Sequence, residues 1–229
     1  MGTKAGAARV ACLCEWTSNA ESGRVTPAGF LHLPGRLDGP SQKALADKVL
    51  EATETAPFYR PITPGGRPMS VLMTNFGPLG WMTDAAGYRY LPEHPVTGAP
   101  WPPIPALLLE LWSLLADPVT PPDACLVNLY RGDARMGLHQ DRDEADFDYP
   151  VLSVSLGDTA TFRLGGSSRS GPITSLKLIS GDVCVMGGEA RLAYHGVHRI
   201  VAGSSGLIPG GGRVNLTLRR ARPSPSRGR

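Results

Sequence analysis

Between about residue 69 and residue 219 the chain consists of short apolar runs separated by Gly, Pro and Asp, and within many runs apolar and polar residues alternate. A period of two is typical of β-strands with one buried face. The strands that this pattern predicts span residues 69–76, 124–130, 151–156, 161–164, 173–179, 183–186 and 213–219. Many short strands joined by glycine-rich turns are typical of a β-sandwich or jelly roll.

Two segments have a helical period instead. We expect Gly39-Pro40-Ser41 to open a helix with Ser41 as its N-cap, and Pro57 to end that helix at about residue 56. This helix is expected to pack outside the sheet. A second helix is expected over residues 103–116, with a leucine stripe that belongs to the core. The stripe consists of Leu107, Leu108, Leu111, Leu114 and Leu115.

The two ends of the chain lack such patterns. Residues 1–26 are rich in Ala, Gly, Ser and Thr, so we expect a poorly ordered lead-in, and we expect residues 221–229 to form a disordered basic tail. A chain of 229 residues with 41% hydrophobic and 19% charged residues is long enough for one large domain, which we place at residues 27–220. The predicted fold class is mainly β with flanking helices.

Charge and cysteine content limit the cellular locations and the binding partners that we expect for this protein. The net charge of +3 misleads, because five of the 23 basic residues lie in residues 219–229 and the first 218 residues carry 18 basic and 20 acidic groups. Attraction for phosphates must then come from local patches. No apolar run approaches the roughly 20 residues of a membrane span, and the four cysteines form no CxxC pair. Residues 1–26 contain no apolar core of 7–15 residues, so we expect no secretory signal. We therefore expect a cytoplasmic protein with reduced thiols and no membrane contact.

The most specific candidate chemistry is the sequence His139-Gln140-Asp141, followed later by His195. In an extended segment residues i and i+2 point to the same side, about 6.5–7 Å apart, so His139 and Asp141 can bind one metal ion. Two histidines and one carboxylate are the ligand set of non-haem Fe(II) oxygenases. Taken alone, His-x-Asp also fits a surface turn in an acidic stretch.

The strand predicted at residues 213–219 adds a second feature. Its period of two puts Arg213, Asn215, Thr217 and Arg219 on one face and apolar residues on the other. A barrel interior that holds a small dicarboxylate would need such a face, because an arginine pairs with a carboxylate through two parallel hydrogen bonds. Asn128 and Tyr130 are also two apart on a predicted strand, and they offer polar groups to the same ligand.

Further segments extend the pattern along the chain. They are Thr63-Pro64-Gly65-Gly66, Met73-Thr74-Asn75, Leu79-Gly80-Trp81, Gly87-Tyr88, Pro122-Asp123-Ala124-Cys125-Leu126, Leu138-His139-Gln140-Asp141, Asp143-Glu144, Val154-Ser155-Leu156-Gly157, Gly165-Gly166, Gly187-Gly188-Glu189, Tyr194-His195-Gly196, and Arg213-Val214-Asn215-Leu216-Thr217 with Arg219. In this order, over roughly residues 27–220, the chain resembles the AlkB family of Fe(II)- and 2-oxoglutarate-dependent dealkylases of nucleic acid bases, and its bacterial DNA-repair members in particular. An ordered series is far more specific than one motif.

The resemblance implies a double-stranded β-helix core with a nucleotide-recognition lid at about residues 60–100. It implies that Fe(II) is the metal, that 2-oxoglutarate and O2 are cosubstrates, and that the iron ligands and catalytic residues are His139, Asp141 and His195. Arg213 matches the residue that pairs with the distal carboxylate of 2-oxoglutarate. The other cosubstrate-lining residues that it implies are Asn128, Tyr130, Asn215 and Arg219. The residues that it places around the damaged nucleotide are Met73, Trp81, Tyr88, Asp143, Glu144 and Arg169.

The implied reaction is oxidative demethylation of bases such as 1-methyladenine and 3-methylcytosine, with release of formaldehyde, succinate and CO2, as direct-reversal DNA repair. These bases are cationic, so an aromatic face and a carboxylate recognise them better than their neutral parents. We expect Trp81 and His139 to sandwich the ring and Asp143 to reach its exocyclic amine. Because the base must leave its stack, we expect single-stranded DNA to be preferred. The enzyme is expected to be a monomer.

Other residues of the same types are expected to have structural or surface roles. His198 is three residues past His195 and is expected to be structural or exposed, Trp101 and Trp112 are expected to be packed in the core, and Asp146 and Asp148 are expected to form a solvated turn. Two other functions remain open. One is a 2-oxoglutarate-dependent oxygenase that acts on RNA, a protein, a lipid or a small molecule. The other is a noncatalytic nucleic-acid-binding domain with a structural metal.

Overall fold

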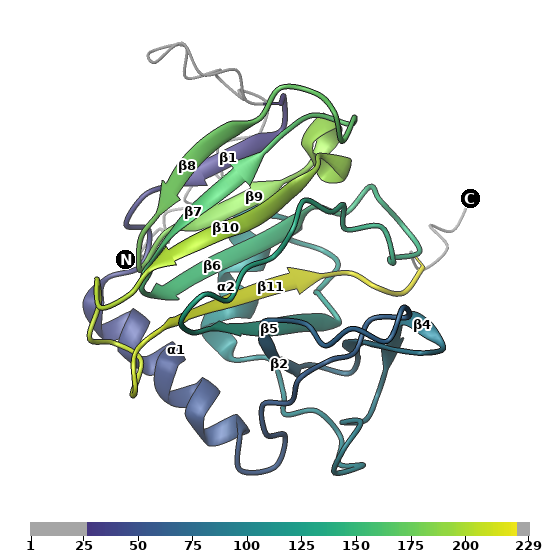
Figure 1. Ribbon diagram of the computed structural model, residues 1–229, viewed down its shortest axis with the longest axis vertical. Coiled ribbons are helices and arrows are strands. Elements are labelled where there is room, and N and C mark those ends of the chain that lie inside the picture. The colour runs from purple at the N-terminus through teal and green to yellow at the C-terminus, as the bar shows by residue number, and fades with distance from the viewer. Residues whose placement is uncertain (1–26, 224–229) are drawn as a thin grey trace, which may run out of the picture.

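The computed structural model describes residues 27–223, whose core is a pair of antiparallel sheets (Figure 1). The larger sheet contains, in spatial order, β1 (Phe30–Leu33), β9 (Val183–Met186), β6 (Val151–Gly157), β11 (Arg213–Arg219), β5 (Ala124–Tyr130) and β2 (Leu72–Phe76). The smaller sheet contains β10 (His195–Val201), β7 (Thr159–Leu164) and β8 (Thr174–Leu178). A separate hairpin is formed by β3 (Gly80–Asp84) and β4 (Gly87–Leu91).

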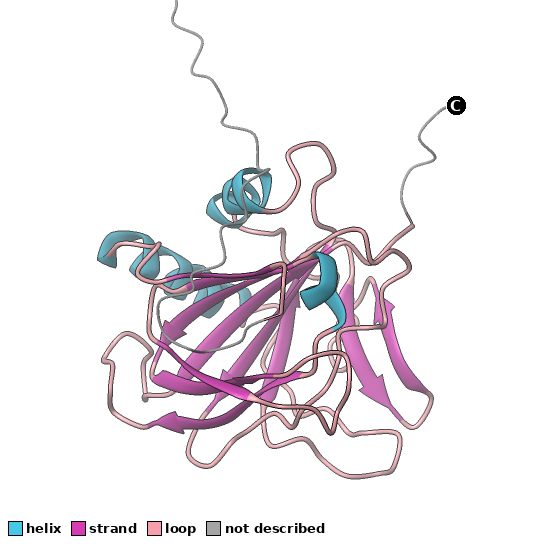
Figure 2. Cartoon of the chain, turned by 90° about the horizontal axis from the view of Figure 1, so that it is seen from above, coloured by secondary structure: helices cyan, strands magenta, loops and turns pink. Residues whose placement is uncertain are grey.

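The two faces of the larger sheet have different roles. Val214, Leu216 and Leu218 of β11 belong to a core cluster that also contains residues of helices α1 (Gly39–Ala52) and α2 (Ala106–Leu115). Figure 2 shows both helices on one side of this sheet. The opposite face of β11 carries the polar residues and looks toward the smaller sheet. The alternation predicted for residues 213–219 is confirmed. Its apolar side chains point into the core, and its polar side chains point toward the candidate site.

A second cluster fills the space between the two sheets. It joins Met73 and Leu126 of the larger sheet to Phe162 and Leu164 of the smaller one, and all four side chains are buried. The predicted fold class, mainly β with flanking helices, is confirmed. The helices lie outside the sheets, so the interior between the sheets is left to the site.

Both predicted helices are present, with corrected ends. The N-cap of α1 is Asp38 and not Ser41, because the Asp38 carboxylate accepts a hydrogen bond of 2.9 Å from the Ser41 N–H. The helix ends at Ala52, four residues earlier than predicted. Helix α2 begins only after Pro105, and Leu114 is 55% exposed, so the prediction that the whole leucine stripe is core is wrong at Leu114.

All the predicted strands are present, although the predicted strand 69–76 begins only at Leu72. The pattern missed β1, β10 and the hairpin β3–β4. Strand β1 is four residues long and only half-buried, and β10 is exposed along its second half, so neither has a strong period. The segment around Trp81 and Tyr88, for which no strand was predicted, is the hairpin.

The hairpin is fixed to the larger sheet by one polar side chain. Asn75, in β2, accepts a hydrogen bond from the Trp81 N–H (3.1 Å) and donates one to the Trp81 carbonyl (3.2 Å). Gly80 lets the chain pass close to Trp101, since a Cβ at this position would lie 2.4 Å from the indole ring. The position of Trp81 is therefore set by β2 and by the buried Trp101.

The predicted lead-in at residues 1–26, with Cys12 and Cys14, lies outside the described residues, as does most of the predicted basic tail. The first residues of that tail are held by the domain, because the N–H groups of Ala221 and Arg222 donate to the Asp123 carboxylate. None of the helices between residues 27 and 223 is long and apolar enough to cross a membrane.

Candidate active site

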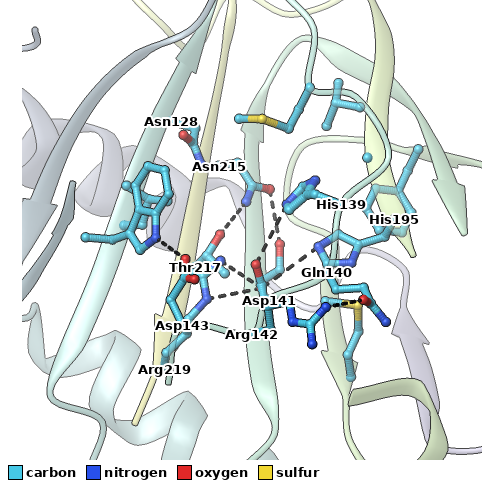
Figure 3. Close-up of a pocket in the computed structure, with 18 of the residues that line it drawn as sticks. Asn128, His139, Gln140, Asp141, Arg142, Asp143, His195, Asn215, Thr217 and Arg219 are labelled. Carbon is cyan, nitrogen blue, oxygen red and sulfur yellow. Dashed lines mark hydrogen bonds and ion pairs between the residues drawn. The ribbon is translucent and has the colours of Figure 1, made fainter. Parts of the chain in front are cut away.

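The three predicted metal ligands meet at one point. His139 and His195 form an isolated antiparallel bridge, in which each backbone N–H donates to the other carbonyl at 2.9 Å. One ligand atom of His139, of Asp141 and of His195 lies within 4.8 Å of the other two, and the imidazole centroids are 4.4 Å apart. Figure 3 shows the two rings and the carboxylate directed toward one another.

Both imidazoles have the tautomer that a metal site requires. The Nδ1 atom of His139 lies 2.9 Å from the Gly137 carbonyl, and that of His195 lies 3.0 Å from the Ala193 carbonyl. A carbonyl oxygen only accepts hydrogen bonds, so Nδ1 carries the hydrogen in each neutral ring and Nε2 keeps its lone pair for a metal ion. The Nε2 atoms lie 3.7 and 3.9 Å from the Asp141 carboxylate oxygens.

Charge in the site also favours metal binding. Burial raises the pKa of the Asp141 carboxyl, but Arg219 and then the two histidines outweigh burial and hold this pKa well below its usual range. Arg219 donates to Asp141 Oδ2 from Nη2 at 2.8 Å and from Nε at 3.1 Å. Burial and the neighbouring His139 lower the pKa of His195 to about 4. At neutral pH Asp141 is therefore ionised and His195 is neutral, as metal ligands must be.

The ligands open onto a cavity of about 410 Å³ that also contains the predicted cosubstrate residues Asn128, Tyr130, Asn215 and Arg219. Asn215 lies opposite Asn128 in the β11–β5 register, and burial raises the pKa of Tyr130 to about 12, so its phenol stays protonated. Two imidazole nitrogens and one carboxylate oxygen with open space on one side fit Fe(II) as a facial triad.

Arg213 lies next to this cavity and does not itself line it. Its side chain is completely buried, and Nη2 donates to Ser155 Oγ at 2.7 Å and to Asn215 Oδ1 at 3.3 Å. Among the described residues Arg213 Nε has no hydrogen-bond partner, nor does the buried Asn128 Oδ1. A buried arginine with a free N–H group is a site for a carboxylate, so these residues fit 2-oxoglutarate.

The predicted substrate residues lie on the outer side of the same cavity. Trp81 and Tyr88 of the hairpin stack with ring centroids 5.7 Å apart, and the Trp81 indole N–H donates to Asp143 Oδ2 at 2.8 Å. Met73 is buried in the cavity wall, and the Arg169 guanidinium lies 5.9 Å from the centroid of the Tyr194 ring. Trp81 and His139 both line the cavity, so a planar ring has access to both.

Glu144 differs from the other predicted substrate residues because its carboxylate is buried and fully paired. Oε2 accepts from Arg191 Nη2 at 2.9 Å, and Oε1 accepts from the Tyr90 hydroxyl and lies 3.5 Å from Arg219 Nε. Its side chain is 2% exposed, although Glu144 also borders the cavity.

Two residues of this arrangement were missed by sequence reasoning. Tyr90 could have been found, because it lies two positions after Tyr88 on the same strand and so on the same face. Arg191 gave no signal, since its partner Glu144 is 47 positions away. Arg191 also donates to the Asp141 carbonyl at 2.6 Å.

The residues assigned to structural or surface roles lie where expected. His198 is exposed, and Trp101 and Trp112 are buried with their indole N–H groups bonded to backbone carbonyls. Cys125 and Cys184 are free and buried, and burial raises the pKa of each thiol to about 12. These two thiols are unreactive in the folded protein.

Comparisons with known proteins agree with this geometry. The model of the 2OG-Fe(II) oxygenase superfamily matches residues 29–219. The alpha-ketoglutarate-dependent dioxygenase AlkB homolog of Caulobacter vibrioides is 63% identical over 194 residues, which cover 85% of this chain and 88% of the relative. AlkB of Escherichia coli is 46% identical over 177 residues, covering 76% and 82% of the two chains. The solved structure of OsALKBH1 superposes with a TM-score of 0.72 at 30% identity, covering 86% of this chain and 98% of that one.

We expect His139→Ala to weaken Fe(II) binding by on the order of 100-fold or more, because one of three ligands is lost. The His139 side chain is 39% exposed, so the variant should still fold. Anaerobic titration calorimetry with Fe(II) measures the affinity. The matched control is His198→Ala, which removes an exposed imidazole and should bind Fe(II) as the wild type does. Equal affinity of the two variants would contradict the assignment of His139.

We expect Arg213→Lys to weaken 2-oxoglutarate binding by roughly tenfold or more, because a lysine ammonium cannot keep the bonds to Ser155 and Asn215 and also offer an N–H group at the place of Arg213 Nε. The measurement is the affinity for 2-oxoglutarate of the anaerobic Fe(II)-loaded protein. Arg199→Lys, on the exposed part of β10, is the control and should leave the affinity unchanged. Unchanged affinity in Arg213→Lys would place the carboxylate elsewhere.

Proposed function

Because the chain belongs to the AlkB group of the 2OG-Fe(II) oxygenase superfamily, we propose that this dioxygenase removes methyl groups from damaged nucleic acid bases and so repairs DNA by direct reversal. One observation supports this substrate most directly. The cavity that contains the iron ligands is bordered by a stacked aromatic pair, Trp81 and Tyr88, and by the exposed carboxylate of Asp143.

An aromatic pair beside a carboxylate fits a flat cation. The bases 1-methyladenine and 3-methylcytosine carry a positive charge, which interacts favourably with aromatic faces and with a negative group. The Asp143 carboxylate lies two residues after the iron ligand Asp141, so a base amine bonded to Asp143 would bring the N-methyl group close to the metal. We assign Met73 and Arg169 to the wall and the rim of the base site.

Bound Fe(II), 2-oxoglutarate and O2 supply the oxidation, in which N–CH3 becomes N–H and formaldehyde while 2-oxoglutarate becomes succinate and CO2. The protein residues hold the reactants. Arg213 and the amides of Asn128 and Asn215 orient the dicarboxylate, and Arg219 keeps the Asp141 carboxylate charged. Tyr130, Leu126 and Phe162 exclude water from the inner part of the cavity.

The hairpin also supports a preference for single strands. We propose residues 60–100, which contain β3 and β4, as the nucleotide-recognition lid. A base reaches the cavity only after it leaves its stack, and this costs least in single-stranded DNA. Arg142 and Arg169 are exposed at the cavity mouth and can contact phosphates. We also propose that the enzyme is a monomer and lies in the cytoplasm, a location that the free buried thiols of Cys125 and Cys184 fit.

We expect formaldehyde release from single-stranded DNA containing 1-methyladenine or 3-methylcytosine, dependent on Fe(II) and 2-oxoglutarate, with one succinate formed for each formaldehyde. Mass spectrometry of single- and double-stranded DNA and RNA oligonucleotides with these lesions measures the products. His139→Ala is the inactive control. No turnover of any methylated oligonucleotide by a protein with bound Fe(II) and 2-oxoglutarate would refute the proposed function.

We expect Asp143→Asn to lower kcat/KM by about tenfold for the cationic base 3-methylcytosine, because a charge-assisted contact contributes roughly 1.4 kcal/mol more than a neutral one. For 3-methylthymine, which is neutral, the same change should lower kcat/KM less than threefold. The ratio of the two kcat/KM values is the measurement. An equal loss for both bases would show that Asp143 does not sense the positive charge.

A further inference from the structure

Two neighbouring carboxylates hold the two strands of the hairpin. Asp143 accepts a hydrogen bond from the Trp81 indole, and Glu144 accepts one from the Tyr90 hydroxyl. Trp81 and Tyr90 are direct partners in the β3–β4 register. One dipeptide, two and three residues after the iron ligand Asp141, therefore bonds to both members of one cross-strand pair.

The two contacts differ in exposure. Asp143 is exposed, so water or a base amine can replace the Trp81 indole at little net cost. The Glu144 side chain is 2% exposed, and a buried acceptor that loses its donor is left unsatisfied. The contact at Asp143 can thus be exchanged for substrate, whereas the contact between Tyr90 and Glu144 cannot.

Glu144 is also tied to the metal ligand from two sides. Arg191 donates to Glu144 Oε2 at 2.9 Å and to the Asp141 carbonyl at 2.6 Å. Arg219 donates to the Asp141 carboxylate at 2.8 Å and lies 3.5 Å from Glu144 Oε1. Two buried guanidiniums therefore connect the carboxylate that holds the hairpin to the carboxylate that binds iron.

The hairpin needs such an attachment. Its sheet has two strands, and a two-stranded hairpin alone is marginally stable in water. Asn75 fixes the backbone of Trp81 in β3, but the bonds of Asn75 do not reach β4. Strand β4, which carries Tyr88, is held at its last residue by the Trp101 indole, which donates to the Leu91 carbonyl at 2.9 Å, and beside the iron ligands by Tyr90.

We propose that Tyr90 and Glu144 are positioning residues, which anchor the hairpin to the iron-ligand segment. The anchor remains in place while the Asp143 carboxylate releases the Trp81 indole and binds the base. This inference rests on the proposed function for the identity of the base, and it assigns to Glu144 a role without substrate contact. When the Asp143 carboxylate binds the base, the Tyr90–Glu144 hydrogen bond keeps the Trp81 and Tyr88 rings at a fixed distance from the metal site.

The test compares Tyr90→Phe with Tyr149→Phe, because each change removes one hydroxyl and keeps the ring. Tyr149 donates to Thr120 at 3.2 Å, away from the hairpin, and its side chain is not part of the site. In the full-length chain, loaded anaerobically with Fe(II) and 2-oxoglutarate, we expect Tyr90→Phe to speed amide hydrogen exchange in residues 80–91. Tyr149→Phe should leave exchange in this segment unchanged.

In steady-state assays we expect Tyr90→Phe to raise KM for methylated single-stranded DNA by about tenfold, the equivalent of one hydrogen bond to a charged group. Its kcat and its Fe(II) affinity should stay within about twofold of wild type, because the ligands themselves are untouched. A fall in kcat with unchanged KM, or hairpin exchange equal to that of Tyr149→Phe, would overturn the proposal.

The two attachments make a second comparison possible. If both hold the hairpin, Asp143→Asn and Tyr90→Phe together should speed hairpin exchange by at least the product of their single effects. A double variant that exchanges no faster than Asp143→Asn alone would mean that Tyr90 does not hold the hairpin, and would overturn the anchoring role. Hydrogen exchange needs no turnover, so this result stands even if methylated oligonucleotides prove not to be substrates.

Discussion

The site depends on a carboxylate that stays ionised although it is buried. Taking a charge out of water is unfavourable by several kcal/mol, roughly, unless a partner compensates for the lost hydration. Asp141 has that partner in Arg219, which donates two hydrogen bonds to one of its oxygens. The other oxygen lies 3.7 Å from His139 Nε2 and is available to a metal. Without Arg219 only the two histidines would oppose the effect of burial, so the pKa of the Asp141 carboxyl would be higher.

The need to compensate buried charges also explains the pattern of residues in β11. A strand that crosses the centre of a sheet normally buries apolar residues on both faces when both faces are covered. In β11 only the face toward the helices is apolar, and the inner face carries Arg213, Asn215 and Arg219. These polar groups are tolerated because they bond to one another, to Ser155 and to Asp141, and because Arg213 keeps one N–H group for a ligand.

Features with a local period could be predicted from the sequence, and features that depend on distant contacts could not. The faces of residues 213–219 and the spacing of His139 and Asp141 follow from geometry two residues apart, so both were found. Strand β10 was missed because only its first half is buried, and the helix start was misplaced because Asp38 competed with Ser41 as a cap. The ordered motifs supplied what periodicity could not, namely the family and its metal.

The pair Asp143-Glu144 shows why a sequence motif does not determine the roles of its members. Both residues are carboxylates beside the ligand segment, and nothing in the local pattern of residues distinguishes their roles. Their surroundings separate them, because water reaches Asp143, while Arg191, Arg219 and Tyr90 surround Glu144. An exposed hydrogen bond contributes little net free energy and can change partners, whereas a buried one is costly to leave unmade. Because of this difference in exposure, Asp143 can bind the substrate, whereas Glu144 must keep its bonds within the protein.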